Sequence, residues 1–370
     1  MVKSKPFSIN VPQSVLDDLQ KRLTRTRWPD EVEGAGWSYG TSRHYMQNLA
    51  DYWLNQYDWR QHEAYLNTLP QYTAEVDGVT LHFIHQPSAN PDAIPVLLMH
   101  GWPDSFYRYH NVIPLLTNKF HLVIPSIPGM GFSERTALTT DNAANLMATL
   151  MTKELGYETF ISAGGDSGAL ISMSLANNHP ELLRGLYLTD VGYPDQTTDF
   201  ASLSKPEQEF ADFIQDWFMK EGAFNMIQST KTQTLAYSLT DSPVGLAAWI
   251  MSMMSSLSTG EELDKRFGQD ELLTNIMIYW VTQTIGSSMQ IYRENMIQSV
   301  SEPKPFKKSD VPAGVAHCPW DAPLPREWAE RRVNLIHFTD LEKGGHFTAW
   351  EAPDIWANDF QTFVQMLNKR

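Results

Sequence analysis

A carboxylate stands at the centre of a glycine-rich segment near the middle of the chain. The short apolar stretch 160–163 runs into residues 164–168, which read Gly-Gly-Asp-Ser-Gly, and a helical pattern follows. A sharp bend between strand and helix leaves no room for side chains beside its central residue, so Gly164 and Gly168 would leave Asp166 exposed at the tip. A carboxylate that attacks carbon leaves an alkyl ester rather than an acyl intermediate. The segment therefore predicts ring opening or halide displacement more than ordinary ester hydrolysis.

The same residues allow a second register, in which Ser167 is central and the protein is a serine esterase. In that register the last tight position holds Ala169 instead of glycine, and we therefore favour Asp166 as the nucleophile. A third interpretation gives the segment no chemistry, because Asp and Ser are common at the start of a helix, where they cap it.

A second loop could stabilise a developing negative charge. The segment 100–103, His-Gly-Trp-Pro, follows the apolar run 94–99, which is typical of a buried parallel strand. If that loop lies beside the bend, the backbone N–H groups of Trp102 and Ser167 form an oxyanion hole. The alternative is a tight turn around a buried histidine. The Trp102–Pro103 bond is also a candidate for the cis isomer.

A base and an orienting acid are expected later in the chain. His346 follows Gly344 and Gly345 in a loop after a predicted strand, and the glycines allow this loop to approach the bend closely. In α/β-hydrolases the nucleophile, the acid and the histidine occur in this order along the chain. The acid is expected near a strand end, and our candidate is Asp321, which ends the proline-rich, poorly helical loop 311–321. Its competitors are Glu327, Glu330, Asp340 and Glu342.

The composition is that of a folded, acidic protein of 370 residues, enough for one large α/β domain with an insertion or for two domains. The formal net charge of −15 makes nucleic acid and anionic membranes poor partners. The single cysteine, Cys318, excludes an intrachain disulfide framework. No metal-ligand motif, P-loop or dinucleotide fingerprint occurs, so we expect neither a metal nor a cofactor. The apolar runs are much shorter than the roughly 20 residues of a membrane span, so we expect a soluble, cytoplasmic protein.

The spacing of apolar residues divides the chain into four parts. Residues 1–70 have helical spacing and form a predicted N-terminal extension. Strand and helix patterns alternate over 71–191 and again over 301–370, which predicts a parallel sheet covered by helices. Residues 192–300 interrupt this alternation and predict a helical cap rich in methionine and aromatic residues. The predicted strands are 72–76, 79–85, 94–99, 121–125, 158–163, 185–189 and 333–338.

Taken together, these motifs resemble the microsomal-type epoxide hydrolases, and the likeness covers nearly the whole chain. Besides the bend and the loop around His346, it includes the segments 6–9, 27–29, 36–40, 125–133 and 240–248. The resemblance implies an α/β-hydrolase fold with an inserted helical cap and a helical N-terminal extension. It also implies Asp166 as nucleophile and His346 as base, and it favours Asp321 as acid because the family's acid follows a Val-Pro-x-Gly loop like that at 311–314.

This sequence departs from the family's pattern at two positions. Two cap tyrosines normally donate hydrogen bonds to the epoxide oxygen; Tyr292 matches one, but Phe224 stands where the other is expected. The tryptophan that usually follows the nucleophile is replaced by Ser167, which makes the floor of the pocket smaller and more polar.

The expected reaction therefore joins a small apolar epoxide and water, with Phe224 and Trp102 lining the substrate site and Tyr292 opening the ring. Three hypotheses remain open. The protein is an epoxide hydrolase with one tyrosine and a substitute donor, a serine esterase, or a diverged biosynthetic or non-catalytic relative. The family's membrane-bound members carry an N-terminal anchor, but this chain begins at the extension, so we expect no anchor. A homodimer is one open option for its assembly.

Overall fold

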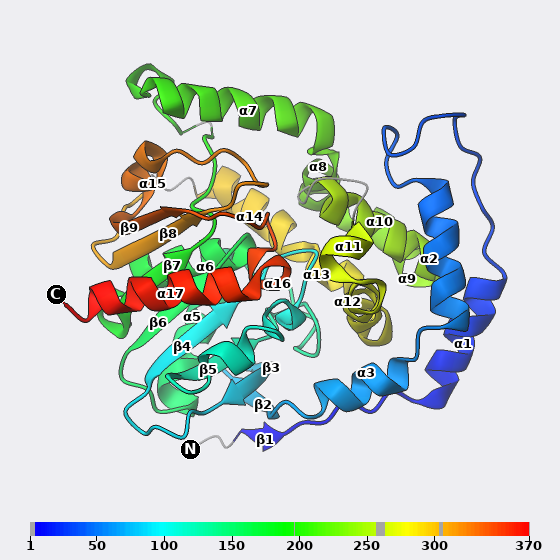
Figure 1. Ribbon diagram of the computed structural model, residues 1–370, viewed down its shortest axis with the longest axis horizontal. Coiled ribbons are helices and arrows are strands. Elements are labelled where there is room, and N and C mark those ends of the chain that lie inside the picture. The colour runs from blue at the N-terminus through cyan, green and yellow to red at the C-terminus, as the bar shows by residue number, and fades with distance from the viewer. Residues whose placement is uncertain (1–3, 196, 257–262, 303–305, 370) are drawn as a thin grey trace.

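The computed structural model describes residues 4–195, 197–256, 263–302 and 306–369. Its centre is a sheet with the strand order β1-β2-β3-β5-β4-β6-β7-β8-β9 (Figure 1). β1, β2 and β3 pair antiparallel, β3 also pairs antiparallel with β5, and the remaining neighbours are parallel. The strands are β1 (Lys5–Pro6), β2 (Gln71–Val76), β3 (Val79–Gln86), β4 (Ile94–Met99), β5 (Phe120–Pro125), β6 (Phe160–Gly164), β7 (Leu183–Leu188), β8 (Pro312–His317) and β9 (Asn334–Asp340).

All seven strands predicted from the sequence are confirmed, with bounds that move by up to two residues. The prediction of a loop over 311–321 is wrong, because Pro312–His317 is strand β8. The segment has only a weak local preference for strand. It forms a strand because it pairs with β7 on one side and β9 on the other, and because the residues Ala313–Ala316 are buried. Pro312 is the first residue of the strand, a position at which proline is tolerated.

The helices form three groups (Figure 1). Those of the sheet layer include α6, which packs on β4, β6 and β7, and α17, which packs on β7, β8 and β9. This group is α4 (Ile113–Leu116), α5 (Thr140–Thr149), α6 (Ser167–Asn178), α15 (Arg326–Arg332), α16 (Thr348–Glu351) and α17 (Pro353–Leu367). Between β7 and β8 lie α7 (Lys205–Glu221), α8 (Ala223–Thr230), α9 (Thr232–Asp241), α10 (Pro243–Ser256), α11 (Leu263–Phe267), α12 (Gln269–Thr282), α13 (Ile285–Ser288) and α14 (Gln290–Ser301). The third group precedes β2 and consists of α1 (Gln13–Thr24), α2 (Arg43–Asn55) and α3 (Trp59–Leu66).

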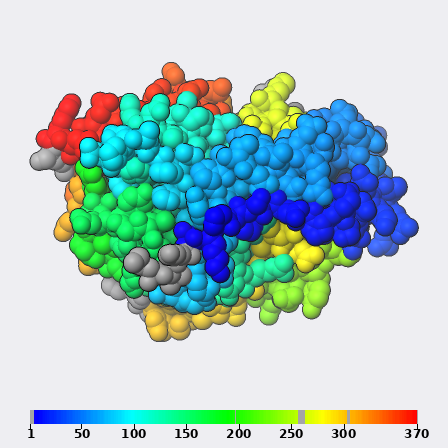
Figure 2. Space-filling model, turned by 90° about the horizontal axis from the view of Figure 1, so that it is seen from below, coloured from blue at the N-terminus to red at the C-terminus, as the bar shows by residue number. Residues whose placement is uncertain are grey.

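The N-terminal helices run along the cap helices, and Figure 2 shows this segment as a blue band across one face of the molecule. Three of its tyrosines bind the cap through their hydroxyl groups. The Tyr45 hydroxyl donates to Asp264 Oδ1 at 2.8 Å, and the Tyr52 hydroxyl donates to Asp270 Oδ1 at 2.9 Å. The Tyr57 hydroxyl lies 3.1 Å from Thr274 Oγ1. Within the described residues, no helix is both long and apolar enough to cross a membrane.

Strand β8 is packed so closely beneath α17 that one of its positions excludes any side chain. A Cβ at Gly314 would lie 2.6 Å from Cδ2 of Phe363, whose ring is fully buried. We expect Gly314→Ala to lower the free energy of unfolding by about 1–3 kcal/mol, because the added methyl group overpacks the core. Chemical denaturation measures this loss. Phe363→Leu is the matched partner: the double variant should lose less stability than the sum of the two single variants, and simple additivity would contradict the packing argument.

Candidate active site

The connection from β6 to α6 is a strained bend centred on Asp166. This residue has φ 53° and ψ −133°, a conformation that residues other than glycine rarely adopt, and Ser167 already begins the helix. Glycine is required on both sides. A Cβ at Gly164 would lie 2.6 Å from the backbone carbon of Gly168, and a Cβ at Gly168 would lie 2.2 Å from the carbonyl oxygen of Met99.

The loop after β4 meets the Asp166 side chain directly. The backbone N–H of Trp102 donates to Asp166 Oδ1 at 2.9 Å, and a Cβ at Gly101 would lie 2.5 Å from the Asp166 Cβ. The Trp102–Pro103 bond is cis, as predicted. Burial alone would raise the pKa of Asp166, but His346 and the backbone N–H groups of Ser167 and Trp102 hold it well below its usual range. The side chain nevertheless keeps 21% of its surface accessible, so a carboxylate held as an anion remains open to a small molecule.

The imidazole of His346 lies between two carboxylates. Its Nδ1 is 3.0 Å from Asp321 Oδ2, and its Nε2 is 3.4 Å from Asp166 Oδ2. Nε2 has no hydrogen-bond partner among the described residues. Burial disfavours the imidazolium, but the negative charges of Asp321 and Asp166 and the hydrogen bond to Asp321 outweigh it and raise the pKa of His346 to about 10. The arrangement therefore holds a protonated imidazole at neutral pH, with one nitrogen facing the Asp166 carboxylate.

The candidate acid, Asp321, lies in the turn that follows β8. Its Oδ1 accepts the backbone N–H of Ala322 at 2.8 Å, which leaves Oδ2 for His346. Two of its competitors are engaged elsewhere: Asp340 pairs with His317 at 2.8 Å, and Glu330 accepts from Arg326 at 2.8 Å. Of the acids considered from the sequence, the structure places Asp321 against the imidazole.

Three aromatic rings from the core and the cap gather beside the bend. The Trp102 ring is nearly parallel to that of Phe224 on α8, with 5.9 Å between centroids, and nearly perpendicular to that of Tyr292 on α14, at 6.0 Å. Burial, followed by the charge of Asp166, raises the pKa of Tyr292 well above its usual value, whereas the side chain of Ser167 opposes this shift. The Tyr292 hydroxyl is therefore a neutral donor near the carboxylate, and Phe224 supplies only an apolar face.

The sequence analysis missed a buried ion pair beneath the loop after β4. The Arg108 Nε donates to Asp104 Oδ2, and both side chains are almost fully buried. The other oxygen of Asp104 accepts the backbone N–H of Gly101 at 3.0 Å, so the pair fixes the backbone that carries Trp102. The sequence does contain an indication of this ion pair, because two opposite charges lie four residues apart directly after His-Gly-Trp-Pro.

A further carboxylate near this site also escaped prediction. Asp190 follows β7, and it lines a small cavity together with Asp321. Burial raises the pKa of Asp190 to about 6, although the N–H of Gly192 and the charge of His346 oppose the shift. Cys318 lines the same cavity and is a buried free thiol. In the described part of the chain, no group of three or more His, Cys, Asp or Glu side chains is arranged to hold a metal ion.

The position of Asp321 predicts how His346 titrates. We expect Asp321→Asn to lower the pKa of His346 from about 10 toward its ordinary value of 6.5, because a negative charge next to the imidazolium is lost. NMR titration of the imidazole resonances measures the shift. Asp340→Asn removes a carboxylate that pairs with a different histidine and is the matched control; an equal shift in both variants would contradict the assignment.

The raised pKa of His346 determines how the stability of the fold changes with pH. A group protonated more strongly in the folded state than in the unfolded chain stabilises the fold most below its unfolded pKa. For His346 that contribution is complete below about pH 6.5 and is lost as the pH rises through about 10.

The sequence of the chain matches two protein-family models and several known proteins. A family model described as "Epoxide hydrolase N terminus" matches residues 4–109, and one described as "alpha/beta hydrolase fold" matches residues 94–280. "Epoxide hydrolase 1" of Sus scrofa is 34% identical over 99% of this chain and 89% of its own.

Solved structures agree with the sequence matches. Juvenile hormone epoxide hydrolase from the silkworm Bombyx mori superposes with a TM-score of 0.87 at 29% identity, covering 100% of this chain and 95% of the other. An Aspergillus niger epoxide hydrolase superposes with a TM-score of 0.86 at 29% identity, covering 99% and 97%. The α/β-hydrolase fold expected from the sequence is confirmed.

Proposed function

The chain belongs to the epoxide hydrolase family of the α/β-hydrolases, and from this membership and its site geometry we propose that it converts a small apolar epoxide to a vicinal diol through an ester on Asp166. One observation carries the proposal. Asp166 stands at the tip of a strained bend, with one carboxylate oxygen accepting the Trp102 N–H and the other facing His346. This geometry supports attack by Oδ2 while Oδ1 stays hydrogen-bonded.

In the first step, the epoxide lies between the carboxylate and the cap. Tyr292 donates a hydrogen bond to the ring oxygen, and Asp166 Oδ2 attacks a ring carbon from the opposite side. The new bond joins Oδ2 to carbon, and the ring carbon–oxygen bond breaks. The ring oxygen takes up a proton and becomes the first hydroxyl group of the product. Phe224 and Trp102 provide the apolar surface for the rest of the substrate.

Ester formation changes the charge that His346 experiences. In the free protein the imidazole is protonated because two carboxylates raise its pKa to about 10. The ester of Asp166 carries no charge, so one of these two influences disappears and the pKa of His346 falls. The proton that His346 then releases balances the proton taken up by the ring oxygen. The first step thereby generates the neutral base that the second step needs.

In the second step, His346 Nε2 accepts a proton from water, and the resulting hydroxide adds to Cγ of the Asp166 ester. Asp321 orients the imidazole through Nδ1 and stabilises its positive charge. The N–H groups of Trp102 and Ser167 hold the oxyanion that forms on Oδ1. The Cγ–Oδ2 bond then breaks and the diol leaves with Oδ2, which takes a proton from the imidazolium. The Asp166 carboxyl group keeps the oxygen that came from water and passes its remaining proton to His346, which restores the carboxylate and the imidazolium of the free protein.

This route predicts the fate of labelled oxygen. In a single turnover of styrene oxide in oxygen-18 water, we expect the label in the peptide that contains Asp166 and none in the first diol, because water attacks the carboxyl carbon. Mass spectrometry of the peptide and the diol measures both. Label in the first diol would show direct attack of water on the epoxide.

Two variants separate this mechanism from a serine esterase. Asp166→Asn should reduce epoxide turnover by at least about 10³-fold, as loss of a covalent nucleophile does. Ser167→Ala keeps the backbone N–H and should retain turnover within a few-fold. The opposite pattern, with ester hydrolysis lost only in Ser167→Ala, would favour the esterase.

The rings of Trp102, Phe224 and Tyr292 lie together, and this arrangement predicts the effect of a second hydroxyl donor. Phe224→Tyr should speed ester formation because it adds a donor on α8 beside Tyr292, whereas Tyr292→Phe should slow it by about 10²–10⁴-fold. Rapid-quench measurement of the ester on Asp166 isolates this step. Phe213→Tyr on the exposed face of α7 is the control for an added hydroxyl. Unchanged ester formation in Tyr292→Phe would remove Tyr292 from the mechanism.

A further inference from the structure

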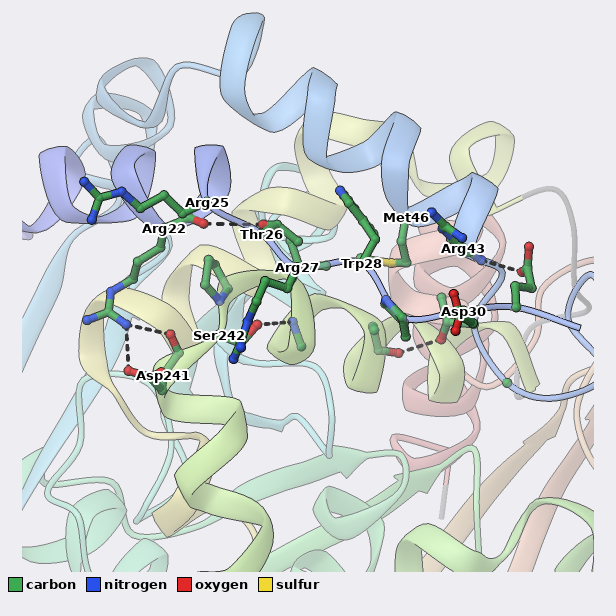
Figure 3. Close-up of a pocket in the computed structure, with 18 of the residues that line it drawn as sticks. Arg22, Arg25, Thr26, Arg27, Trp28, Asp30, Arg43, Met46, Asp241 and Ser242 are labelled. Carbon is green, nitrogen blue, oxygen red and sulfur yellow. Dashed lines mark hydrogen bonds and ion pairs between the residues drawn. The ribbon is translucent and has the colours of Figure 1, made fainter.

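The cap contacts the rest of the chain in several places. The start of α10 and the connection from α1 to α2 enclose a groove of about 820 Å³, and none of the candidate catalytic residues lines it (Figure 3). Beside this groove Arg22 of α1 donates to Asp241 at 2.7 Å, which joins the extension to the cap. Elsewhere the cap helix α11 packs on α16, which begins two residues after His346. This second contact reaches the backbone around His346.

A single carboxylate binds the backbone on both sides of His346. Glu351 is the last residue of α16, and its Oε2 accepts the N–H of Gly345 at 3.1 Å while its Oε1 accepts the N–H of Phe347 at 3.0 Å. Hydrogen bonds to a charged acceptor are roughly twice as strong as neutral ones. Only 1% of the Glu351 side chain is exposed, so water has little access to replace these bonds. The backbone is therefore held immediately before and immediately after His346.

The charge of this buried carboxylate is compensated from the cap. Arg266 lies on α11, and its Nη2 forms an ion pair with Glu351 Oε2. The next residue, Phe267, fixes α11 against α16, because its buried ring lies 4.9 Å from that of Trp350. Removing one partner of a buried ion pair is strongly destabilising, since the other charge is left uncompensated. The hydrogen bonds that flank His346 thus depend on a residue of the cap.

The same arginine also contacts the turn that carries the acid. The guanidinium carbon of Arg266 lies 4.6 Å from the centre of the Trp320 ring, within the distance of a cation–π contact. Trp320 directly precedes Asp321, and its backbone N–H donates to the carbonyl oxygen of Gly344 at 3.2 Å. A Cβ at Gly345 would lie 3.0 Å from Arg266 Nη2, so the glycine permits this close approach. Base, acid and cap are therefore linked through one arginine.

We propose that Glu351 is a positioning residue for the hydrolysis of the ester, acting through the two backbone N–H groups that flank His346, with Arg266 of the cap as its counter-ion. The inference rests on the proposed function, in which His346 takes a proton from water only in the second step. A misplacement of about 1 Å can slow such a step by about 10²-fold. Ester formation uses the Asp166 carboxylate and the Tyr292 hydroxyl, so loss of Glu351 slows the second step and not the first.

Rapid-quench kinetics with styrene oxide separates the two steps. In Glu351→Gln we expect ester formation within about three-fold of the wild type and ester hydrolysis slower by about 10²-fold, so that the ester on Asp166 accumulates. The glutamine keeps one acceptor oxygen but turns an NH₂ group toward the other backbone donor. Equal slowing of both steps, or an unchanged rate of hydrolysis, would overturn the proposal.

Glu207→Gln is the matched control. Glu207 is a buried carboxylate of the cap helix α7, and it pairs at 2.7 Å with Arg331 of α15 in the sheet layer. This variant therefore also removes a buried carboxylate that joins the cap to the sheet layer, but not one that binds the backbone beside His346. Both steps should stay within about three-fold of the wild type. Hydrolysis slowed as much as in Glu351→Gln would overturn the proposal.

A double variant separates position from stability. Glu351→Gln combined with Arg266→Met removes both members of the ion pair, so no uncompensated buried charge remains. Thermal denaturation should show that the double variant regains stability lost in Glu351→Gln. Ester hydrolysis should stay slow, because the backbone beside His346 is still not held. Recovery of hydrolysis together with stability would show that Glu351 only supports the fold, and would overturn the proposal.

NMR titration of His346 tests its position without any turnover. An imidazole displaced from Asp321 and Asp166 loses part of their influence, so its pKa should fall below about 10. The double variant has the net charge of the wild type, so a fall there reports position. An unchanged pKa in the double variant would overturn the proposal. If the wild type forms no ester on Asp166 but the pKa falls as expected, the proposed reaction is wrong and the positioning of His346 by Glu351 is supported.

Discussion

The contact between two backbone turns determines the rest of the site. The turn after β4 and the bend after β6 approach so closely that Gly101, Gly164 and Gly168 leave no room for a Cβ. This approach delivers the Trp102 N–H to one oxygen of Asp166 and leaves the other oxygen facing the imidazole. The strained backbone of Asp166 persists because the turn after β4 packs against the bend and holds it in place. The geometry of the candidate site is therefore primarily a property of main-chain packing.

The charges around His346 are the second determinant of the site. The imidazole of His346 is buried between the carboxylates of Asp166 and Asp321, so its protonation depends on whether Asp166 is charged. A mechanism that esterifies Asp166 therefore changes the protonation of His346 without any movement of the chain. The ion pair of Asp104 and Arg108 lies below this arrangement and adds no net charge, while it fixes the Gly101 backbone.

Much of the fold and the arrangement of the site could be predicted from the sequence, because glycine spacing and apolar runs report local constraints. The bend at Asp166 and the parallel strands were predicted for that reason. Strand β8 was missed because its conformation depends on pairing with β7 and β9 rather than on its proline-containing sequence. Local pattern alone left several competitors to Asp321 as the partner of His346, and the family resemblance favoured Asp321. Asp190 was not considered, because such contacts depend on how distant strand ends meet. The groove between the N-terminal extension and the start of α10 unites segments that lie far apart in the sequence, and no local pattern reveals such a meeting.

The three tyrosine hydroxyls that join the extension to the cap restrict how the protein can open. Hydrogen bonds of this kind each contribute about 1 kcal/mol, and a rigid swing of the cap away from the extension would break all three together. Any opening of the cap must therefore either break these three contacts or carry the extension with it.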